Sequence, residues 1–337
     1  MERKNFKWGI VSPGRIAHKF AIGLSAVPGA QLWAVAGRNS ANVGAFAAQY
    51  DAPQQYNSLE SMLANSGIDA LYIASPNTLH YEQTMLALEH KVPVLCEKPL
   101  TLNVQMAKAM YAKAKTQKAF LMEAMWTSFL PHMQAVRKSV ADGAIGEPKY
   151  LRADFGYIAD PDPKSRIFDP GLGGGALLDI GIYPLYLALT LFGPVSSWSL
   201  DYSLSDTGID KEESIMLRHT SGQVSQLVVS VCANLPTTAT IGGTQGSIHI
   251  DPQWLRPVHF DIQLHGATIS RSRHLHPVRA NGFEYEAEEL MRCVAAGQLE
   301  SSIVPWALSL QVVELMDVMR KQMGIVYPAE ATAAPTP

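Results

Sequence analysis

The feature that most constrains the fold is an alternation of apolar and helix-forming segments in the first third of the chain. Apolar runs expected to be strands lie at Phe6–Val11, Gln31–Ala36, Ile68–Ala74 and Val92–Cys96. Segments with helical periodicity lie at Ala41–Tyr50, Thr78–His90 and Val104–Thr116. Continuous apolar strands that are joined through helices are typical of a parallel sheet covered on both faces.

Beyond about Trp126 the pattern changes to short strands separated by turn signals such as Ser221-Gly222. The expected strands are Tyr150–Tyr157, Trp198–Leu204, Ser214–His219, Gln223–Val231, Ser247–Ile250, Val258–Leu264 and Thr268–Ser270, and the expected helices are His132–Ala141, Ala176–Leu191, Phe283–Ala295 and Pro305–Met323. This pattern predicts an α+β domain on a mainly antiparallel sheet. A chain of 337 residues is too long for one ordinary hydrophobic core, so we expect an α/β protein with domains at 1–126 and 127–328. The Pro/Ala/Thr-rich tail at 329–337 is expected to be disordered.

Composition excludes several classes of protein. A net charge of −3 gives no global field that favours nucleic acid or an anionic membrane. Three distant cysteines, Cys96, Cys232 and Cys293, show no metal spacing and fit reduced thiols in a cytosol. The charged N-terminus is not followed by a long apolar segment. We therefore expect a cytoplasmic protein without a metal site or a membrane span, whose partner is a small molecule.

The turn after the first predicted strand resembles a dinucleotide-binding turn with one glycine replaced. The usual fingerprint has three small residues, and here Ser12, Gly14 and Ala17 occupy those places. Gly14 lets the backbone approach a pyrophosphate, and the helix that starts at Arg15-Ile16 directs its N-terminus at the anion. We expect Ser12, Gly14, Arg15 and Ile16 to bind the cofactor; the alternative is a plain strand–turn–helix connection.

The end of the second predicted strand bears on which cofactor binds. An NAD-specific site usually carries an acidic residue here for the ribose hydroxyl, but this chain has Arg38 and Asn39. A guanidinium suits a 2′-phosphate through bidentate bonding and stacks on adenine. We expect Arg38 and Asn39 to bind NADP rather than NAD, and the alternative is a solvated surface arginine.

Two further segments follow buried strands, so they lie at the carboxyl ends where ligands bind in open α/β sheets. Ser75-Pro76-Asn77 is expected to line the cofactor, together with His80 at the start of the next helix. Glu97-Lys98-Pro99 ends the fourth apolar strand, which directs Glu97 and Lys98 into the crevice. A lysine held there can polarise a hydroxyl or carbonyl. A Glu–Lys pair on a solvated loop is the alternative.

The glycine-rich segment Gly173–Tyr183 feeds a predicted helix. Asp179 and Tyr183 are four residues apart and share one helix face, where a carboxylate and a phenol can relay a proton. An ordinary amphipathic helix is the alternative. The substrate is expected to contact Asp179 together with Trp126, Phe155 and Arg166. The alternative for Trp126 is a place in the core, and the alternative for Arg166 is a salt bridge.

Taken in order, "GIVSPGRIA", "VAGRN", "ASPNTLHYE", "LCEKPL", "MEAMWTSFLP" and "GGGALLDIGIY" span nearly the whole chain. As a set they resemble the Gfo/Idh/MocA oxidoreductases. The nearest branch is the one that holds dihydrodiol dehydrogenase, glucose–fructose oxidoreductase and NADP-linked xylose dehydrogenases. The resemblance implies an N-terminal Rossmann domain, a C-terminal domain with a large open antiparallel sheet, sheet-to-sheet dimerisation and hydride transfer. Ser12 departs from the family's first glycine.

The resemblance also implies roles for individual residues. Tyr183 is the general acid/base, Lys98 lowers the pKa of Tyr183 and binds the same substrate oxygen, and Asp179 orients the substrate or Lys98. The Lys98–Pro99 bond is expected to be cis, as in relatives. The implied activity is that of an NADP-dependent dehydrogenase or reductase acting on CH–OH groups of a sugar, polyol or cyclic diol. The alternative is a non-catalytic NADP-sensing regulatory protein on the same fold.

Overall fold

The protein is described from a computed structural model, which covers residues 5–250, 253–255 and 259–332. The chain forms two compact units. The first combines Met1–Phe129 with Arg279–Leu310, and the second combines Leu130–Val278 with Gln311–Pro337. Each unit is built on one sheet.

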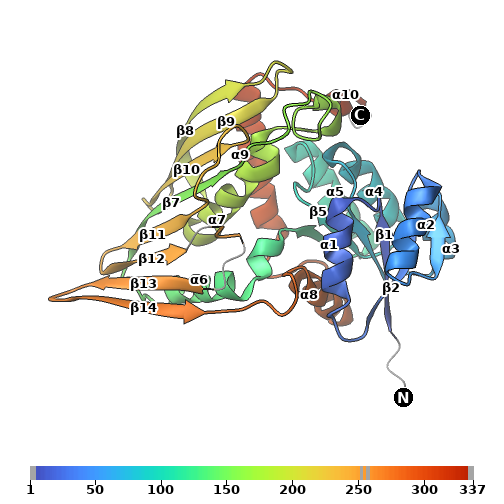
Figure 1. Cartoon of the computed structure of the whole chain (residues 1–337), viewed down its shortest axis with the longest axis horizontal. Coiled ribbons are helices and arrows are strands. Elements are labelled where there is room, and N and C mark those ends of the chain that lie inside the picture. Colours follow the sequence, from blue (N-terminus) through green and yellow to red (C-terminus); the bar gives the residue numbers. More distant parts are fainter. Residues whose placement is uncertain (1–4, 251–252, 256–258, 333–337) are drawn as a thin grey trace. The chain divides into compact units, whose positions relative to one another are not determined.

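The first unit holds a six-stranded parallel sheet in the order β3-β2-β1-β4-β5-β6 (Figure 1). Its strands are β1 (Phe6–Val11), β2 (Ala30–Ala36), β3 (Gln54–Tyr56), β4 (Ala70–Ile73), β5 (Val94–Glu97) and β6 (Leu121–Ala124), and the helices between them are α1 (Arg15–Leu24), α2 (Ser40–Gln49), α3 (Leu59–Asn65), α4 (His80–Glu89) and α5 (Val104–Gln117). This strand order defines a Rossmann sheet, whose order reverses between β1 and β4. The parallel sheet expected from the sequence is confirmed.

The central strands explain why the sequence reads as continuous apolar runs. Every residue of β4, β5 and β6 is buried. Tyr72 of β4 stacks on Phe20 of α1 at a centroid distance of 3.8 Å, and Trp8 of β1 packs edge-on against Phe20. Two buried acids, Glu97 of β5 and Glu123 of β6, interrupt this apolar interior at the carboxyl ends of their strands.

The predicted division at 126/127 is incomplete, because helix α8 (Glu284–Ala295) joins the first unit. The segment before α8 lies against α1. The Asn281 amide donates to the carbonyl of Lys19 at 2.7 Å. A Cβ on Gly23 would lie 2.8 Å from Cβ of Phe283, so only glycine fits this approach. Packing against α1 therefore returns a segment far along the chain to the Rossmann unit.

The second unit holds an eight-stranded sheet in the order β14-β13-β12-β11-β7-β10-β9-β8. Its strands are β7 (Pro148–Gly156), β8 (Val195–Leu204), β9 (Asp210–His219), β10 (Val224–Ser230), β11 (Ala239–Gly243), β12 (Gly246–Ile250), β13 (His259–His265) and β14 (Ile269–Leu275). Only β7 and β10 pair in parallel among the neighbours described. The mainly antiparallel sheet is confirmed, and the predicted start of one strand at Val258 lies outside the described residues.

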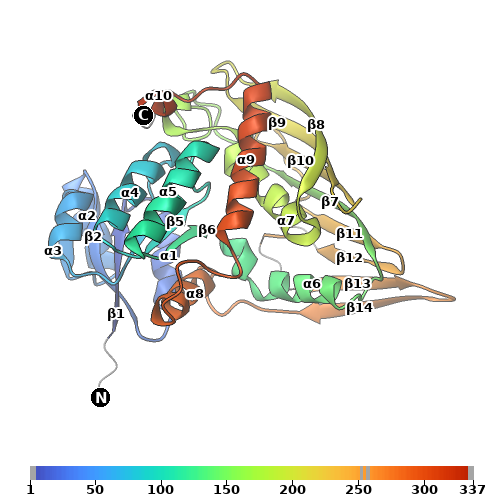
Figure 2. The ribbon, with the colours of Figure 1, turned by 180° about the vertical axis from the view of Figure 1, so that it is seen from behind.

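One face of this sheet carries the helices α6 (Pro131–Ala141) and α7 (Ile182–Phe192) (Figures 1 and 2). Strand β9 alternates accordingly: Ile215 and Leu217 are buried, whereas Met216 is 41% exposed. The stretch Pro170–Phe192, which includes α7, has the length and hydropathy of a membrane span, but 89% of its apolar window is buried inside the structure. A core helix that is mostly buried passes the same test of length and composition.

The end of the chain corrects the expectation of a disordered tail from residue 329. Helix α9 (Trp306–Gln322) is followed by the short helix α10 (Pro328–Thr332). Glu330 of α10 receives two hydrogen bonds from the buried guanidinium of Arg320, at 2.6 and 2.7 Å. This ion pair fixes residues that composition alone assigned to disorder. Residues 333–337 lie outside the described residues.

Candidate active site

The turn after β1 has the geometry of a dinucleotide-binding turn. Ser12 has a φ of +64°, the left-handed conformation that the usual glycine adopts freely. Helix α1 begins at Arg15, and no side chain caps its N-terminus. A Cβ on Gly14 would meet nothing closer than the Ser12 carbonyl at 3.9 Å. A helix start without a side-chain cap, next to a glycine with room around it, suits a pyrophosphate, so the residues present fit a dinucleotide.

Arg38 and Asn39 follow β2, and their side chains have different surroundings. Arg38 is exposed and lies two residues beyond the carboxyl end of β2. Asn39 caps helix α2, since its side-chain oxygen accepts the N–H of Asn42 at 3.1 Å. The helix cap fixes the start of α2 beside Arg38. Contact of Arg38 and Asn39 with a cofactor stays a prediction.

His80 joins the two loops that follow β4 and β5. Its ring nitrogens lie 2.8 Å from the carbonyl oxygen of Pro99 and 3.0 Å from that of Ser75. The His80 side chain is fully buried, and burial lowers the pKa of His80. The hydroxyl of Ser75 donates to Gln83 at 2.8 Å. In the structure His80 is therefore a buried link between the predicted cofactor loops, and its contact with the cofactor stays a prediction.

The Glu97-Lys98-Pro99 segment ends β5, and its Lys98–Pro99 bond is cis, as expected. The Glu97 carboxylate is buried rather than solvated. It accepts the phenolic O–H of Tyr72 and the main-chain N–H of Lys98, the latter at 3.2 Å. The alternative of a Glu–Lys pair on a solvated loop is wrong for Glu97, because its carboxylate anchors the backbone of Lys98 from inside.

A second carboxyl, Glu286 of α8, lies in the same interior. Neither of its oxygens has a hydrogen-bond partner among the described residues. Burial, and then the charge of Glu97, raise the pKa of Glu286 well above its ordinary value. Burial is the main cause that raises the pKa of Tyr72, and its interactions with Glu97 and Glu286 raise the pKa further. The raised pKa of Glu286 favours its protonated form beside the buried Glu97.

Glu123 of β6 holds the other side of the lysine segment. Its carboxylate accepts the N–H of Leu100 at 2.8 Å and the hydroxyl of Ser309 at 2.6 Å. Burial raises the pKa of Glu123, and the Lys98 ammonium acts in the opposite direction. The backbone on both sides of Lys98 is therefore held by buried carboxyl groups of the same unit.

In the second unit, Asp179 is the centre of a polar network. Its carboxylate accepts a hydrogen bond from Arg166 at 2.7 Å and another from the Tyr157 hydroxyl at 3.0 Å. Asp179 is buried, whereas the Arg166 side chain is 45% exposed. The salt bridge weighed for Arg166 is present.

Tyr183 lies beside this network on α7. Its ring is buried and tilted against Phe155 at a centroid distance of 5.8 Å. Asp179 belongs to a π-helical segment, Leu177–Gly181, which continues directly into α7. Departures of this kind are frequent at functional sites. The structure therefore brings Phe155, Arg166, Asp179 and Tyr183 together within one unit.

Tyr157 was not predicted as a member of this network. The signal was present, because Phe155 and Tyr157 are two residues apart and a strand places such residues on one face. Trp126, expected at the substrate, is buried and stacks on Phe283 at 5.0 Å with an interplanar angle of 6°. Its contact with substrate stays a prediction.

Comparison with known proteins identifies the family. Residues 6–125 match the model described as an oxidoreductase family with an NAD-binding Rossmann fold, and residues 133–249 match the GFO/IDH/MocA C-terminal domain. Trans-1,2-dihydrobenzene-1,2-diol dehydrogenase of Danio rerio is 34% identical over 328 residues, which is 95% of this chain and 98% of that protein. The enzyme of that name from Homo sapiens is 31% identical over 335 residues, 96% of this chain and 98% of that protein. The chain belongs to the Gfo/Idh/MocA oxidoreductase family.

Solved structures show the same fold at low identity. Levoglucosan dehydrogenase in complex with NADH has a TM-score of 0.86 and 21% identity, over 95% of this chain and 97% of that chain. Aldose–aldose oxidoreductase from Caulobacter crescentus, complexed with glycerol, has a TM-score of 0.85 and 24% identity, over 96% and 99% of the two chains. KijD10, a 3-ketoreductase from Actinomadura kijaniata with bound NADP, has a TM-score of 0.83 and 22% identity, over 94% and 97%.

The left-handed backbone at Ser12 generates a stability prediction. A Cβ in this conformation costs about 1–2 kcal/mol, and Ser12→Gly removes it at some cost in unfolded-state entropy. We expect Ser12→Gly to stabilise the protein by about 0.5–1 kcal/mol, measured by thermal unfolding. Ser12→Ala is the matched control, because it removes the hydroxyl but keeps the Cβ. Equal stability of the glycine and alanine variants would contradict the assigned strain.

The buried Glu286 generates a pH prediction. Because the fold raises the pKa of Glu286, the native state binds this proton more tightly than the unfolded chain does. This contribution to stability is fully present below the ordinary pKa of 4.5 and is lost as the pH rises through the folded-state pKa. Glu286→Gln keeps the neutral shape, so we expect it to be more stable than the wild type by about 1–3 kcal/mol near pH 8.

Glu284, two residues earlier on α8, provides the control. Its carboxylate accepts the N–H groups of Ala280, Asn281 and Gly282 at 2.7, 3.2 and 2.7 Å. Glu284→Gln weakens these charge-assisted bonds and is expected to destabilise the protein at the same pH. Urea unfolding across the pH range measures both variants. A loss of stability in Glu286→Gln near pH 8 would mean that Glu286 is ionised in the fold.

Proposed function

We propose that this protein is an NADP-dependent dehydrogenase or reductase that acts on a CH–OH group of a sugar, polyol or cyclic diol. The observation that carries the proposal is the Asp179 network, which sets a carboxylate, a guanidinium and the phenol of Tyr183 beside one another in the substrate unit. Relatives named as diol dehydrogenases and fold neighbours named as sugar oxidoreductases support this substrate class.

The cofactor proposal rests on the first unit. The uncapped start of α1 and the open space at Gly14 favour a pyrophosphate. Exposed Arg38 stands where an acidic residue would favour NAD, and its guanidinium suits the 2′-phosphate of NADP. Ser75, Pro76, Asn77 and Lys98 would line the nicotinamide side from the ends of β4 and β5. When bound, the nicotinamide supplies the hydride chemistry.

The residues of this chain then manage the proton. In the oxidation direction the carbinol carbon loses a hydride, and its hydroxyl proton passes to the Tyr183 phenolate, which leaves a carbonyl. In reduction the Tyr183 hydroxyl returns that proton to the carbonyl oxygen. Lys98 stabilises the negative charge that develops on the oxygen atoms during either transfer. Such acid–base assistance contributes roughly 100- to 10,000-fold in rate.

Asp179 is assigned to orienting the substrate. Its carboxylate is already held by Arg166 and Tyr157, which fixes its direction. A carboxylate beside an exposed guanidinium presents an acceptor next to a donor, and neighbouring hydroxyl groups of a diol or sugar match that pair. Phe155 and Trp126 are assigned to the apolar side of the substrate.

Two variants test the catalytic assignment. Tyr183→Phe removes the proton carrier, and Lys98→Met removes the positive charge. We expect each to lower kcat by at least about 100-fold while NADPH still binds. Turnover is followed by nicotinamide absorbance with NADP⁺ or NAD⁺ and a panel of aldoses, deoxysugars, polyols and trans-dihydrodiols.

Lys113→Met on α5 and Tyr150→Phe on β7 are matched controls, because they remove the same groups from other places in the chain. Full activity of either site variant contradicts the mechanism. Wild-type protein that binds NADPH but turns over none of the panel contradicts the proposed enzyme and favours a cofactor-sensing regulatory protein.

Arg38 tests the cofactor. Loss of a bidentate contact with a phosphate is expected to raise the Kd for NADP about 10- to 100-fold in Arg38→Ala, or about 1.4–2.8 kcal/mol. The Kd for NAD is expected to stay within about twofold, because that cofactor has no 2′-phosphate. Fluorescence titration measures both constants, with Arg152→Ala on β7 as the control. An equal change for both cofactors contradicts the assignment of Arg38 to the 2′-phosphate.

Assembly and location stay predictions from the sequence. The face of the eight-stranded sheet on which Met216 is exposed is the surface expected to pair two copies of the chain. A homodimer or a higher homo-oligomer in the cytoplasm is the arrangement we propose.

A further inference from the structure

The helix that carries Asp179 and Tyr183 starts in a way that needs external support. Gly173, Gly174 and Gly175 precede it, and Gly175 has a φ of +119°. The first helical turns, Leu177–Gly181, are π-helical rather than α-helical. Glycines and a π-helical segment hold their geometry weakly by themselves. The direction of Asp179 and Tyr183 therefore depends on what restrains this entry.

One restraint comes from the start of β9. The Asp210 carboxylate accepts the N–H of Leu177 at 2.6 Å, in the first turn of the helix. Asp210 is 1% exposed, and a Cβ on Gly175 would lie 2.4 Å from its Oδ1, so the turn fits closely around the carboxylate. A carboxylate at the N-terminal end of a helix accepts hydrogen bonds from main-chain N–H groups and interacts favourably with the positive end of the helix dipole.

A second buried acid, Glu213, is on the same strand. It is 2% exposed and lies beside Asp210. Burial, and then the charge of Asp210, raise the pKa of Glu213 well above its ordinary value. Burial raises the pKa of Asp210 as well, and the main-chain N–H of Leu177 acts in the opposite direction.

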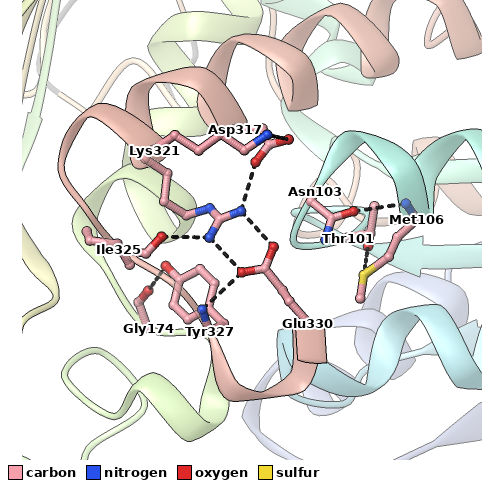
Figure 3. Close-up of polar contacts among 10 residues, drawn as sticks. Thr101, Asn103, Met106, Gly174, Asp317, Lys321, Ile325, Tyr327 and Glu330 are labelled. Atoms are coloured by element: carbon pink, nitrogen blue, oxygen red, sulfur yellow. Dashed lines mark hydrogen bonds and ion pairs between the residues drawn. The ribbon is translucent and has the colours of Figure 1, made fainter. Parts of the chain in front are cut away.

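The other restraint comes from the end of the chain (Figure 3). The Tyr327 hydroxyl donates to the carbonyl of Gly174 at 2.5 Å, and the Tyr327 ring is fully buried. The main-chain N–H of Tyr327 donates to Glu330 at 3.0 Å. Arg320 then binds Glu330 and the carbonyl of Ile325, the latter at 2.8 Å, and its guanidinium lies 5.1 Å from the centre of the Tyr327 ring.

We propose that Asp210 and Tyr327 are positioning residues that clamp the start of the helix carrying Asp179 and Tyr183. Asp210 binds the main-chain N–H of Leu177, and Tyr327 binds the main-chain carbonyl of Gly174. Tyr327 lies near the end of the chain, and its hydroxyl binds the glycine loop from which the helix starts. The clamp therefore gives a C-terminal residue a part in the reaction. The inference rests on the proposed function in one respect, namely that Asp179 and Tyr183 act on the substrate. The restraint itself is independent of that assignment.

Hydrogen exchange tests the restraint directly in the full-length protein. Tyr327→Phe removes one hydroxyl and keeps the ring. We expect main-chain amides from Gly175 to Tyr183 to exchange at least about tenfold faster, while those of β8 and of α1 are unchanged. Asp210→Asn keeps one acceptor and is expected to give a smaller increase in the same segment. Tyr150→Phe on β7, which loses an exposed phenol bond to Gln226 of β10, is the control.

Kinetics then test the positioning role. Tyr327→Phe is expected to lower kcat about 10- to 100-fold with the KM for NADP unchanged, since only the helix geometry is altered. Unchanged exchange in 175–183, or an equal increase across the whole second unit, overturns the clamp. An unchanged kcat with faster local exchange overturns the positioning role. If the wild type has no turnover, the proposed function fails, and the exchange data still decide whether the clamp exists.

Discussion

The parallel pairing of β1 with β2 and β4 is the constraint on which the first unit depends. Parallel strands need a crossover between them, and every crossover returns the chain to the same edge of the sheet. The loops after β1, β2, β4 and β5 therefore gather at one edge, although the sequence separates Ser12 from Lys98 by most of the unit. The order reversal between β1 and β4 opens the crevice there. Without this pairing the predicted cofactor residues would have no common location.

Buried carboxyl groups set the second level of organisation. A buried charge is costly unless hydrogen bonds satisfy it, and most of these acids bind main-chain N–H groups. Glu97 and Glu123 hold the backbone on either side of Lys98, and Asp210 holds the first turn of the Asp179–Tyr183 helix. Each acid is thus buried at a place where irregular backbone carries a candidate functional side chain. Rigid support of this kind is what an active site requires.

Much of the fold was predictable because its signals are local. Buried strands and amphipathic helices follow from hydrophobic periodicity, and β1 was predicted with its observed bounds. Short elements carry too few residues for a period, and β3, β6 and β11 were missed for that reason. The fate of the C-terminal segment was also missed. Its Pro/Ala/Thr composition suggests disorder, but the partner of Glu330 is Arg320, ten residues earlier on another helix.

The candidate site divides in the same way. The sequence marks Lys98 by its place at the end of a strand, and it marks Asp179 and Tyr183 by their helical spacing. Glu286 and Tyr327 are not marked in this way, because each acts through a residue distant in the chain. No local pattern marks such a pair.

The sequence by itself determined the two sheets, the dinucleotide turn and the family, since each of these follows from short-range periodicity or from motifs in order. Tertiary structure alone decided that α8 returns to the Rossmann unit, that Glu97 is buried beneath Lys98, and that Asp210 and Tyr327 meet at one glycine turn. The physical reason is that buried hydrogen bonds and close backbone contacts form between atoms whose distance is fixed only when the sheet and its helices have packed.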